Sequence, residues 1–250
     1  MRETDFLNGF AKGLRVLEAF GEATPRLSIA DVSRLTDLDR ATSRRCLLTL
    51  AKLGYADYDG KFFVLTPRVL RIGHAYLSAT SLPQIVQPQL DRLSEGISQS
   101  TSVSVLDGSE IVYVARASHR RVMSINLMPG SRLPAYCASM GRVLLAAISP
   151  DSATQLLNQS DLRSFTPHTK TDPAELMEEL AKVRLQGFAV IDQELELGLC
   201  SIAVPLRNGR NQTVAALNIG APAAQIPADG LANLFLPRLL TVAETLRPIL

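Results

Sequence analysis

The chain has 250 residues, of which 46% are hydrophobic and 20% are charged, a composition that indicates a globular protein and excludes a disordered one. Its formal net charge of +2 excludes a uniformly basic surface, but residues 1–80 hold 12 Lys and Arg against 9 Asp and Glu, so the positive excess lies there. No run approaches the roughly 18 apolar residues of a membrane span, and the N-terminus lacks the apolar core of a secretion signal, so we expect a cytoplasmic protein without a membrane partner.

Two helices are predicted before residue 38. The first covers roughly residues 5–20, and the stretch LSIADVSRLTDL predicts a second, short helix. Ser28 is its expected N-cap, and Asp31, three residues later, completes a variant of the capping box. A turn of three to four residues around Asp37 is expected to lead into a third helix.

The third helix is predicted in LDRATSRRCLLTLAKLGY, residues 38–55, and Gly54 is expected to end it. Apolar residues follow the period of one buried helix face at Cys46, Leu47, Leu50 and Leu53. The other side is cationic, with Arg44, Arg45 and Lys52, and with Arg40 on its flank. A basic helix face is often merely solvated, so this segment alone leaves water and nucleic acid as equal alternatives.

The next segment favours nucleic acid. YADYDGKFFVL alternates in polarity and carries Asp59-Gly60, the dipeptide of a tight type I′ hairpin. The order helix, turn, cationic helix and small hairpin is that of a winged helix-turn-helix, in which arginine binds phosphates and guanine edges. We therefore predict double-stranded DNA as a partner, bound by Ser28, Arg40, Thr42, Ser43, Arg44, Arg45 and Lys61.

A linker helix is predicted over residues 66–80, with Thr66 as its cap and Pro67 at the first helical position. The helix predicted after it, in QIVQPQLDRLSEGI, tolerates Pro88 only near its first turns. We therefore expect three parts, namely a winged helix-turn-helix domain over residues 1–65, the linker helix over 66–80, and a second domain over 81–250.

In the second domain the hydrophobic period changes to two. Two hairpins are predicted, one turning at Asp107-Gly108 and one at Asn208-Gly209. Further strands are expected near VMSINL and FAVIDQ, and helices from about Ser139, from Asp151, from Asp172 and after Pro227. Strands first and last, with helices between them, predict an α+β domain in which helices cover one mostly antiparallel sheet.

Signals of an enzyme are sparse. The sequence has no P-loop, nucleophile elbow or zinc-protease motif, and the spacing of Cys46, Cys137 and Cys200 matches no metal site, so neither a metal nor another cofactor is predicted. Cys137 lies at an expected helix start, where the pKa of a thiol can fall, but no base is near it in the pattern. A thiol-dependent enzyme is therefore a remote alternative to a protein without catalytic activity.

A carboxylate-binding pocket is the favoured function of the same region. LPAYCASMGR places Tyr136 and Ser139 where a loop becomes a helix, and the free N–H groups of a helix start favour an anion. IDQELELGLCSIAVP adds Asp192 and Ser201, and AALNIG adds Asn218. For Asp192 and Glu194, a solvated strand end is an equal alternative to a role in ligand binding.

Five segments together carry a resemblance to a known family: KGLRVLEAF, LDRATSRRCLLTLAKLGY, GSRLPAYCASMGRVLLAA, VRLQGFAVIDQELELGL and SIAVPLRNGRNQTVAALNIG. Over nearly its whole length the chain resembles an IclR-type transcriptional regulator. GHAYLSATSLP, RLPAYCASMGR and DQELELGL are most similar to the regulators of aromatic-acid catabolism through protocatechuate, 4-hydroxybenzoate and the β-ketoadipate pathway. The resemblance implies a winged-helix domain, a linker helix and a GAF-like effector-binding domain, in homodimers or dimers of dimers on palindromic operators.

The resemblance also implies an effector pocket lined by Ser139, Met140, Ile191, Ser201, Asn218 and Gly220. Met140 and Ile191 are bulkier than a very small polar metabolite needs, and they suit a ring. We therefore expect an aromatic carboxylate such as 4-hydroxybenzoate or protocatechuate, with a short aliphatic acid such as glyoxylate or pyruvate as the alternative. Arg132, Tyr136 and Ser139 are the candidates to hold the carboxylate, Asp192 is a further candidate pocket residue, and a surface loop is the alternative place for Arg132.

Overall fold

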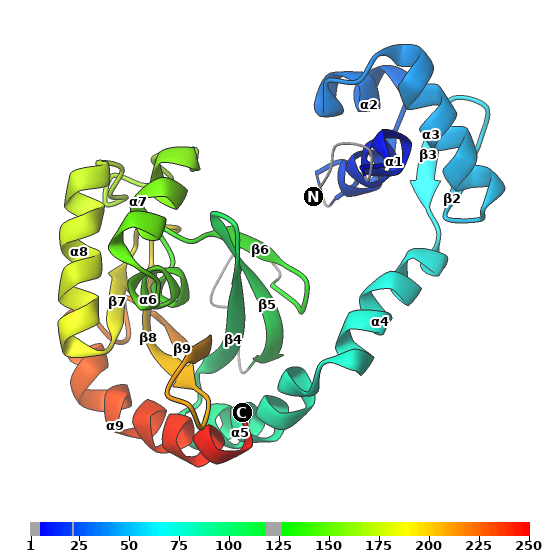
Figure 1. Ribbon diagram of the computed structural model, residues 1–250. Coiled ribbons are helices and arrows are strands. Elements are labelled where there is room, and N and C mark those ends of the chain that lie inside the picture. The colour runs from blue at the N-terminus through cyan, green and yellow to red at the C-terminus, as the bar shows by residue number, and fades with distance from the viewer. Residues whose placement is uncertain (1–5, 22, 119–126) are drawn as a thin grey trace. The chain divides into compact units, whose positions relative to one another are not determined.

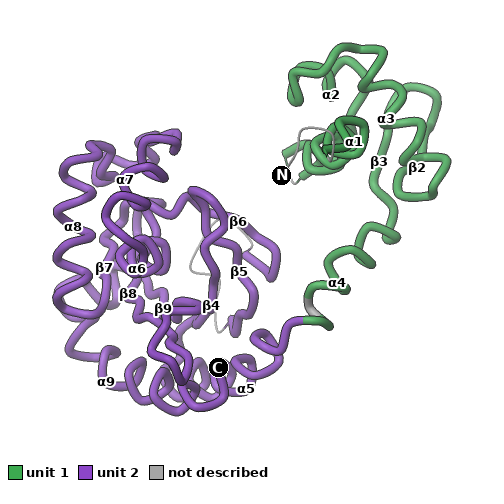
Figure 2. The backbone as a smooth tube through the Cα atoms, in the orientation of Figure 1, with its two compact units in different colours: residues 1–79 green, residues 80–250 purple. Residues whose placement is uncertain are grey.

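The structure is a computed structural model that describes residues 6–21, 23–118 and 127–250. It divides into two compact units, residues 1–79 and 80–250 (Figure 2), each of which is described by itself. Within the described ranges, no helix is both long and apolar enough to cross a membrane.

The first unit is a winged helix-turn-helix (Figure 1). Its strands pair antiparallel in the order β1-β3-β2, and Val16, Leu47 and Phe63 are fully buried in its core. The elements are α1 (Asn8–Glu18), β1 (Arg26–Leu27), α2 (Ile29–Thr36), α3 (Arg40–Lys52), β2 (Ala56–Tyr58), β3 (Phe63–Leu65), a 3₁₀ turn (Pro67–Val69) and α4 (Leu70–Ala79).

Local polar contacts set the ends of α2 and α3 as predicted. The Ser28 and Asp31 side chains form both halves of a capping box at the start of α2. Asp37 turns the chain with a left-handed φ of 54°, and the Asp39 carboxylate then accepts from Thr42 N at 2.8 Å to cap α3. Gly54 follows α3 with a φ of 78°, a conformation that glycine adopts without strain.

Two expectations for this unit are wrong in detail. A type I′ turn needs positive φ at both central residues, but only Gly60 has it, and four residues join β2 to β3. Instead, the Asp59 carboxylate accepts from Lys61 N and Phe62 N and closes the loop. Leu53, expected on the buried face of α3, is 54% exposed because it follows the last helical residue.

The second unit is an α+β domain, as predicted (Figure 1). Its six strands are all antiparallel, in the order β6-β5-β4-β9-β8-β7; α6 packs on one face, α7 and α8 lie beyond it, and α5 and α9 cover the other face. The elements are α5 (Ser81–Ile97), β4 (Ser100–Asp107), β5 (Glu110–Ala117), β6 (Arg132–Pro134), α6 (Ser139–Ala147), α7 (Pro150–Gln159), α8 (Pro173–Gln186), β7 (Ala189–Asp192), β8 (Leu199–Arg207), β9 (Thr213–Pro222), α9 (Ala228–Leu246) and a final 3₁₀ turn (Arg247–Ile249).

Three expectations for the linker and the second unit need comment. The linker helix is capped by Thr66 as predicted and ends before Thr80, which separates α4 from α5, but it opens with a 3₁₀ turn rather than with α-helix. Pro88 lies inside α5, which begins at Ser81, rather than in its first turns. The strand expected near VMSINL, residues 122–127, falls almost entirely outside the described residues.

Gly141 lets α6 pack against the turn that precedes it. A Cβ atom added there would lie 2.1 Å from the Ala135 carbonyl oxygen, far inside van der Waals contact with backbone. We expect Gly141→Ala to lower the free energy of unfolding by about 1–3 kcal/mol or more, as overpacking does. Thermal unfolding measures this, and Gly230→Ala, where the nearest atom is 4.0 Å away, is the matched control. Equal melting temperatures for the two variants would contradict the packing argument.

Candidate functional sites

The outer face of α3 carries arginines that the fold does not use. Arg40, Arg44 and Arg45 are exposed, and none of their guanidinium groups has an ion pair or a hydrogen bond among the residues described. Lys61, on the β2–β3 loop, is also exposed, with its ammonium 5.0 Å from the Phe62 ring centre. These cations are free to bind phosphates or base edges.

Two serines predicted to contact DNA are used by the fold itself. Ser43 is fully buried, and its hydroxyl lies 3.5 Å from the Leu38 carbonyl oxygen, so its prediction as a DNA contact is wrong. It is buried because it lies one turn before Leu47 on the inner face of α3. Ser28 is half-buried, and its hydroxyl donates a hydrogen bond to the Asp31 carboxylate. Thr42 is also half-buried, and its hydroxyl donates to the Asp39 carboxylate.

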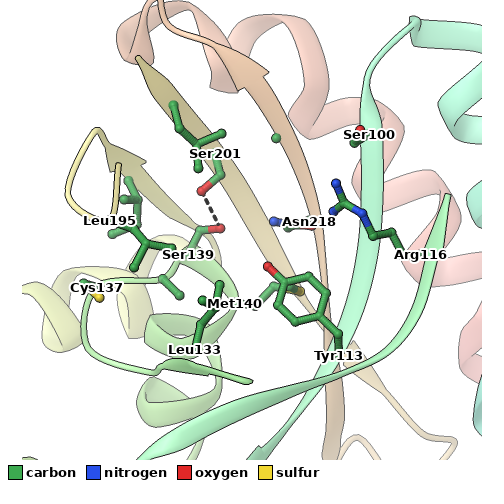
Figure 3. A pocket seen from close by; sticks show the side chains of 14 residues that line it. Ser100, Tyr113, Arg116, Leu133, Cys137, Ser139, Met140, Leu195, Ser201 and Asn218 are labelled. Carbon is green, nitrogen blue, oxygen red and sulfur yellow. Dashed lines mark hydrogen bonds between the residues drawn. The ribbon is translucent and has the colours of Figure 1, made fainter. Parts of the chain in front are cut away.

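The second unit contains a small cavity between the sheet and the start of α6 (Figure 3). Its volume is about 40 Å³. Its wall is mostly apolar, with a few polar groups from β4, β5, β8, β9 and α6. It is lined by Ser100, Tyr113, Arg116, Leu133, Cys137, Ala138, Ser139, Met140, Ile191, Leu195, Leu199, Ser201, Asn218 and Gly220.

A β-bulge brings Tyr113 and Arg116 into the same cavity. Ser104 pairs with Tyr113, but Val103 pairs with Ala115, so Val114 is an extra residue on β5. Three residues apart on a regular strand, Tyr113 and Arg116 would point to opposite faces. The extra residue places both side chains on the same face of the sheet. Arg116 pairs with Ser102 there, on the face that α6 covers.

Arg116 is the cation of this cavity. Its side chain is half-buried and donates to Ser102 Oγ at 2.9 Å and to Ser118 Oγ at 3.0 Å. No carboxylate pairs with it within the described part of the chain, and burial lowers the pKa of the guanidinium without discharging it. Figure 3 shows Arg116 and Asn218 pointing toward the space that Tyr113 also enters. This arrangement is suited to an anionic group on a molecule that fills the cavity.

Six predicted pocket residues lie together around this cavity. They come from four elements, α6, β7, β8 and β9, and strand register explains two of the contacts, because Ser201 pairs with both Ile191 and Gly220. Ser201 Oγ also donates to Ser139 Oγ at 2.9 Å across the cavity wall. The six are Ser139, Met140, Ile191, Ser201, Asn218 and Gly220.

Three other predicted residues do not line the cavity. Arg132 lies on the surface and pairs with Glu110 at 2.6 Å and Asp107 at 2.8 Å, which matches its surface alternative. Tyr136 is buried, with its hydroxyl donating to the Arg163 carbonyl oxygen. Asp192 is exposed at the end of β7 and accepts from Cys200 Sγ at 3.0 Å. Their expected contact with a ligand is therefore wrong for this cavity.

Three lining residues that β4 and β5 contribute were not predicted from the sequence, namely Ser100, Tyr113 and Arg116. One signal was present, since ARA places a cation in an otherwise apolar alternating strand. A strict period of two places Arg116 and Tyr113 on opposite faces of the strand. The bulge at Val114 brings them to the same face.

Burial disfavours the ionised form of several thiol and phenol side chains in this region. It raises the pKa of the Cys137 and Cys200 thiols to about 12, and that of the Tyr113 and Tyr136 hydroxyls also to about 12. The remote alternative of a thiol-dependent enzyme needs a lowered pKa at Cys137, whereas burial raises this pKa, and a thiol that stays protonated is a poor nucleophile.

These raised values predict a loss of stability in alkali. Above pH 9 to 10 the unfolded chain releases protons that the folded chain still holds, so the free energy of unfolding should fall until the pH reaches about 12. Urea unfolding at pH 8, 9, 10 and 11 measures the slope, and a Cys137→Ala, Cys200→Ala variant should have a smaller one. A free energy that is constant or rises over this range would contradict the burial of these groups.

Comparisons with known proteins agree with both units. Residues 10–60 match the IclR helix-turn-helix domain, and residues 74–247 match the C-terminal domain of the bacterial transcriptional regulator IclR. The chain is 45% identical to the Pca regulon regulatory protein of Pseudomonas putida, over 98% of this chain and 84% of that protein. It is 38% identical to the p-hydroxybenzoate hydroxylase transcriptional activator of Acinetobacter baylyi, over 99% of this chain and 93% of that protein.

A solved structure resembles the second unit. It is the inducer-binding domain of a PobR double mutant from Acinetobacter in complex with 3-hydroxybenzoic acid. The two chains are 33% identical, with a TM-score of 0.64, over 67% of this chain and 98% of that one. The domain matches cover more than half of the chain, and the relatives match it over nearly its full length. The chain therefore belongs to the IclR family of transcriptional regulators.

Proposed function

We propose that this regulator binds an aromatic carboxylate in the cavity of its second unit and thereby controls genes of aromatic-acid catabolism. The observation that carries the proposal is Arg116, a half-buried cation with no carboxylate partner among the described residues, in a mostly apolar cavity. An anion with an apolar body satisfies both parts of that lining. The names of the relatives support the same class, since one is a regulatory protein of the Pca regulon, one is a transcriptional activator for p-hydroxybenzoate hydroxylase, and one is solved in complex with 3-hydroxybenzoic acid.

The lining assigns a role to each part of such a ligand. Arg116 holds the carboxylate, and the neighbouring amide of Asn218 contributes a donor. Tyr113 and Met140 contact the ring. The paired hydroxyls of Ser139 and Ser201 provide donors and acceptors for a ring hydroxyl. A short aliphatic acid would leave the apolar part of the lining without a partner, which favours the aromatic class.

The size of the cavity implies that binding changes the unit. A volume of about 40 Å³ holds only a few water molecules, on the scale of roughly 10–15 Å³ for each. A hydroxybenzoate must therefore displace side chains at the sheet or at the start of α6. Movement that accompanies binding is what a regulator needs, because an effector shifts an equilibrium only when it contacts two states differently.

We also propose that the first unit binds a palindromic operator as part of a homodimer or a dimer of dimers in the cytoplasm. The exposed arginines of α3 support contact with the major groove. Exposed apolar side chains on the same unit support contact with a second copy, because monomers seldom leave many of them uncovered. They include Leu7, Phe10, Leu70, Ile72 and Tyr76, each at least 48% exposed.

Calorimetry with four acids tests the ligand class. We expect saturable heat from 4-hydroxybenzoate and from protocatechuate, and none at the same concentrations from pyruvate or glyoxylate. Heat from an aliphatic acid alone would reject the aromatic effector. A Cys137→Ala variant should still bind the aromatic acids, with at most a modest change in affinity from the altered lining, because burial raises the pKa of the Cys137 thiol to about 12 and leaves it without a nucleophilic role.

A further inference from the structure

Among the described residues of the second unit, the most deeply buried charge has contacts that have not been described so far. Arg142, on α6, has a side chain only 2% exposed. Its Nη2 donates to Glu194 Oε2 at 2.7 Å, and the Glu194 side chain is 5% exposed. Taking two charges out of water costs free energy unless further hydrogen bonds satisfy them, so the arrangement around this pair is informative.

The Arg142 guanidinium holds two segments that form walls of the effector cavity. Its Nε donates to the Tyr136 carbonyl oxygen at 2.9 Å, directly before the turn that carries Cys137 to Met140 into the lining. Its partner Glu194 directly precedes Leu195, which also lines the cavity and lies near Ser139 and Cys137 (Figure 3). The Arg142 guanidinium therefore contacts both segments, although it does not itself line the cavity.

The segment 193–198 between β7 and β8 is anchored at several further points. Thr166 Oγ1 donates to the Gln193 carbonyl oxygen at 2.7 Å, and Thr169 Oγ1 donates to that of Glu194 at 2.5 Å. Lys170 N donates to the Glu194 carboxylate at 3.2 Å, and Gln193 has a left-handed φ of 56°. These contacts hold Glu194 and fix the backbone on which Leu195 stands.

We infer that Arg142 and Glu194 are positioning residues for the effector, which set the spacing between the 136–140 turn and the 193–198 segment and so the shape of the cavity wall that a ring contacts. This inference rests on the proposed effector function. Neither side chain touches the ligand; each acts through the wall residue beside it. Loss of the ion pair lets the two walls separate and weakens binding while the sheet itself stays intact.

The chain offers a matched control. Glu179 on α8 also faces Arg142, at 3.9 Å, but it holds neither wall of the cavity. Glu194→Gln and Glu179→Gln each remove one negative charge near the same guanidinium. We expect Glu194→Gln to weaken the affinity for 4-hydroxybenzoate about tenfold, within the range typical of coupled sites, and Glu179→Gln to leave it unchanged.

A double variant guards against misfolding. Arg142→Met alone leaves a buried carboxylate unpaired and is expected to unfold readily, whereas Arg142→Met with Glu194→Met removes both charges together. We expect the double variant to fold, as its near-ultraviolet circular dichroism would show, and to bind 4-hydroxybenzoate at least as weakly as Glu194→Gln. Wild-type affinity in the folded double variant would overturn the inference.

Hydrogen exchange separates this inference from the function on which it rests. In Glu194→Gln, the amides of residues 136–140 and 193–199 should exchange faster than in the wild type, with or without an effector. If the wild type binds none of the aromatic acids, the proposed effector is wrong, but the exchange experiment still tests the walls. Unchanged exchange in Glu194→Gln, or affinity losses in both glutamine variants that merely follow their melting temperatures, would overturn the positioning role.

Discussion

Replacing Arg40 and Arg44 with alanine together should strongly weaken specific operator binding. The two guanidinium groups lie one turn apart on the exposed face of α3 and have no partner among the described residues, so nothing in the fold competes with DNA for them. A bidentate contact to a base is worth about 1–3 kcal/mol, so the double change should cost roughly 30-fold to 10,000-fold in affinity. Electrophoretic mobility shift with an operator selected from random DNA measures the loss.

The control for this pair is Lys52→Ala at the other end of α3. The last helical residue lies about 18 Å from the first, at 1.5 Å per residue, and base contacts come mainly from the start of a recognition helix. Lys52→Ala should therefore weaken binding slightly and equally for all sequences. The two arginine replacements should leave the melting temperature unchanged. Operator affinity equal to that of the wild type in the double variant would refute the assignment of α3 as the recognition helix.

Replacing Arg116 with methionine should eliminate the response to the aromatic acid. Methionine fills a similar volume but cannot pair with a carboxylate, which would then be buried without its counter-charge. Truncating one partner of a buried, hydrogen-bonded charge pair costs about 2–5 kcal/mol, so the affinity for 4-hydroxybenzoate should fall roughly 30-fold to several thousand-fold. Calorimetry measures the affinity, and a reporter gene driven by the operator measures the response.

Arg132→Met is the matched control, and it separates two assignments of the carboxylate partner. Arg132 is one of the three candidates predicted from the sequence, but its guanidinium already pairs with Glu110 and Asp107 on the surface. Its loss should change stability little, as exposed ion pairs contribute about 0–1 kcal/mol, and should leave the effector affinity unchanged. The opposite pattern, with Arg132→Met unresponsive and Arg116→Met normal, would move the ligand to another site.

Features that depend on local chemistry could be predicted from the sequence. Ser28 with Asp31, and Gly54, set the ends of helices through contacts within a few residues, so the pattern alone sufficed. The burial of Ser43 could also have been predicted, since a spacing of four places it on the inner face beside Leu47.

Features that depend on strand register could not be predicted. The bulge at Val114 turns Arg116 toward the cavity, and it arises from pairing between β4 and β5 that no local pattern encodes. The ion pair of Arg142 and Glu194 joins residues 52 positions apart, brought together by the packing of α6 beside β7. The type of the β2–β3 turn depended on the Asp59 side chain, which replaced the expected type I′ geometry.

The central claim is that an aromatic acid in the second unit changes how the first unit binds DNA. Fluorescence anisotropy of a labelled operator, titrated with the wild-type protein with and without saturating 4-hydroxybenzoate, tests it most directly. Allosteric coupling of about 1–3 kcal/mol predicts that the acid changes the operator dissociation constant roughly 5-fold to 150-fold, and that Arg116→Met shows no change. Superimposable titrations of the wild type in the presence and absence of the acid would contradict the account.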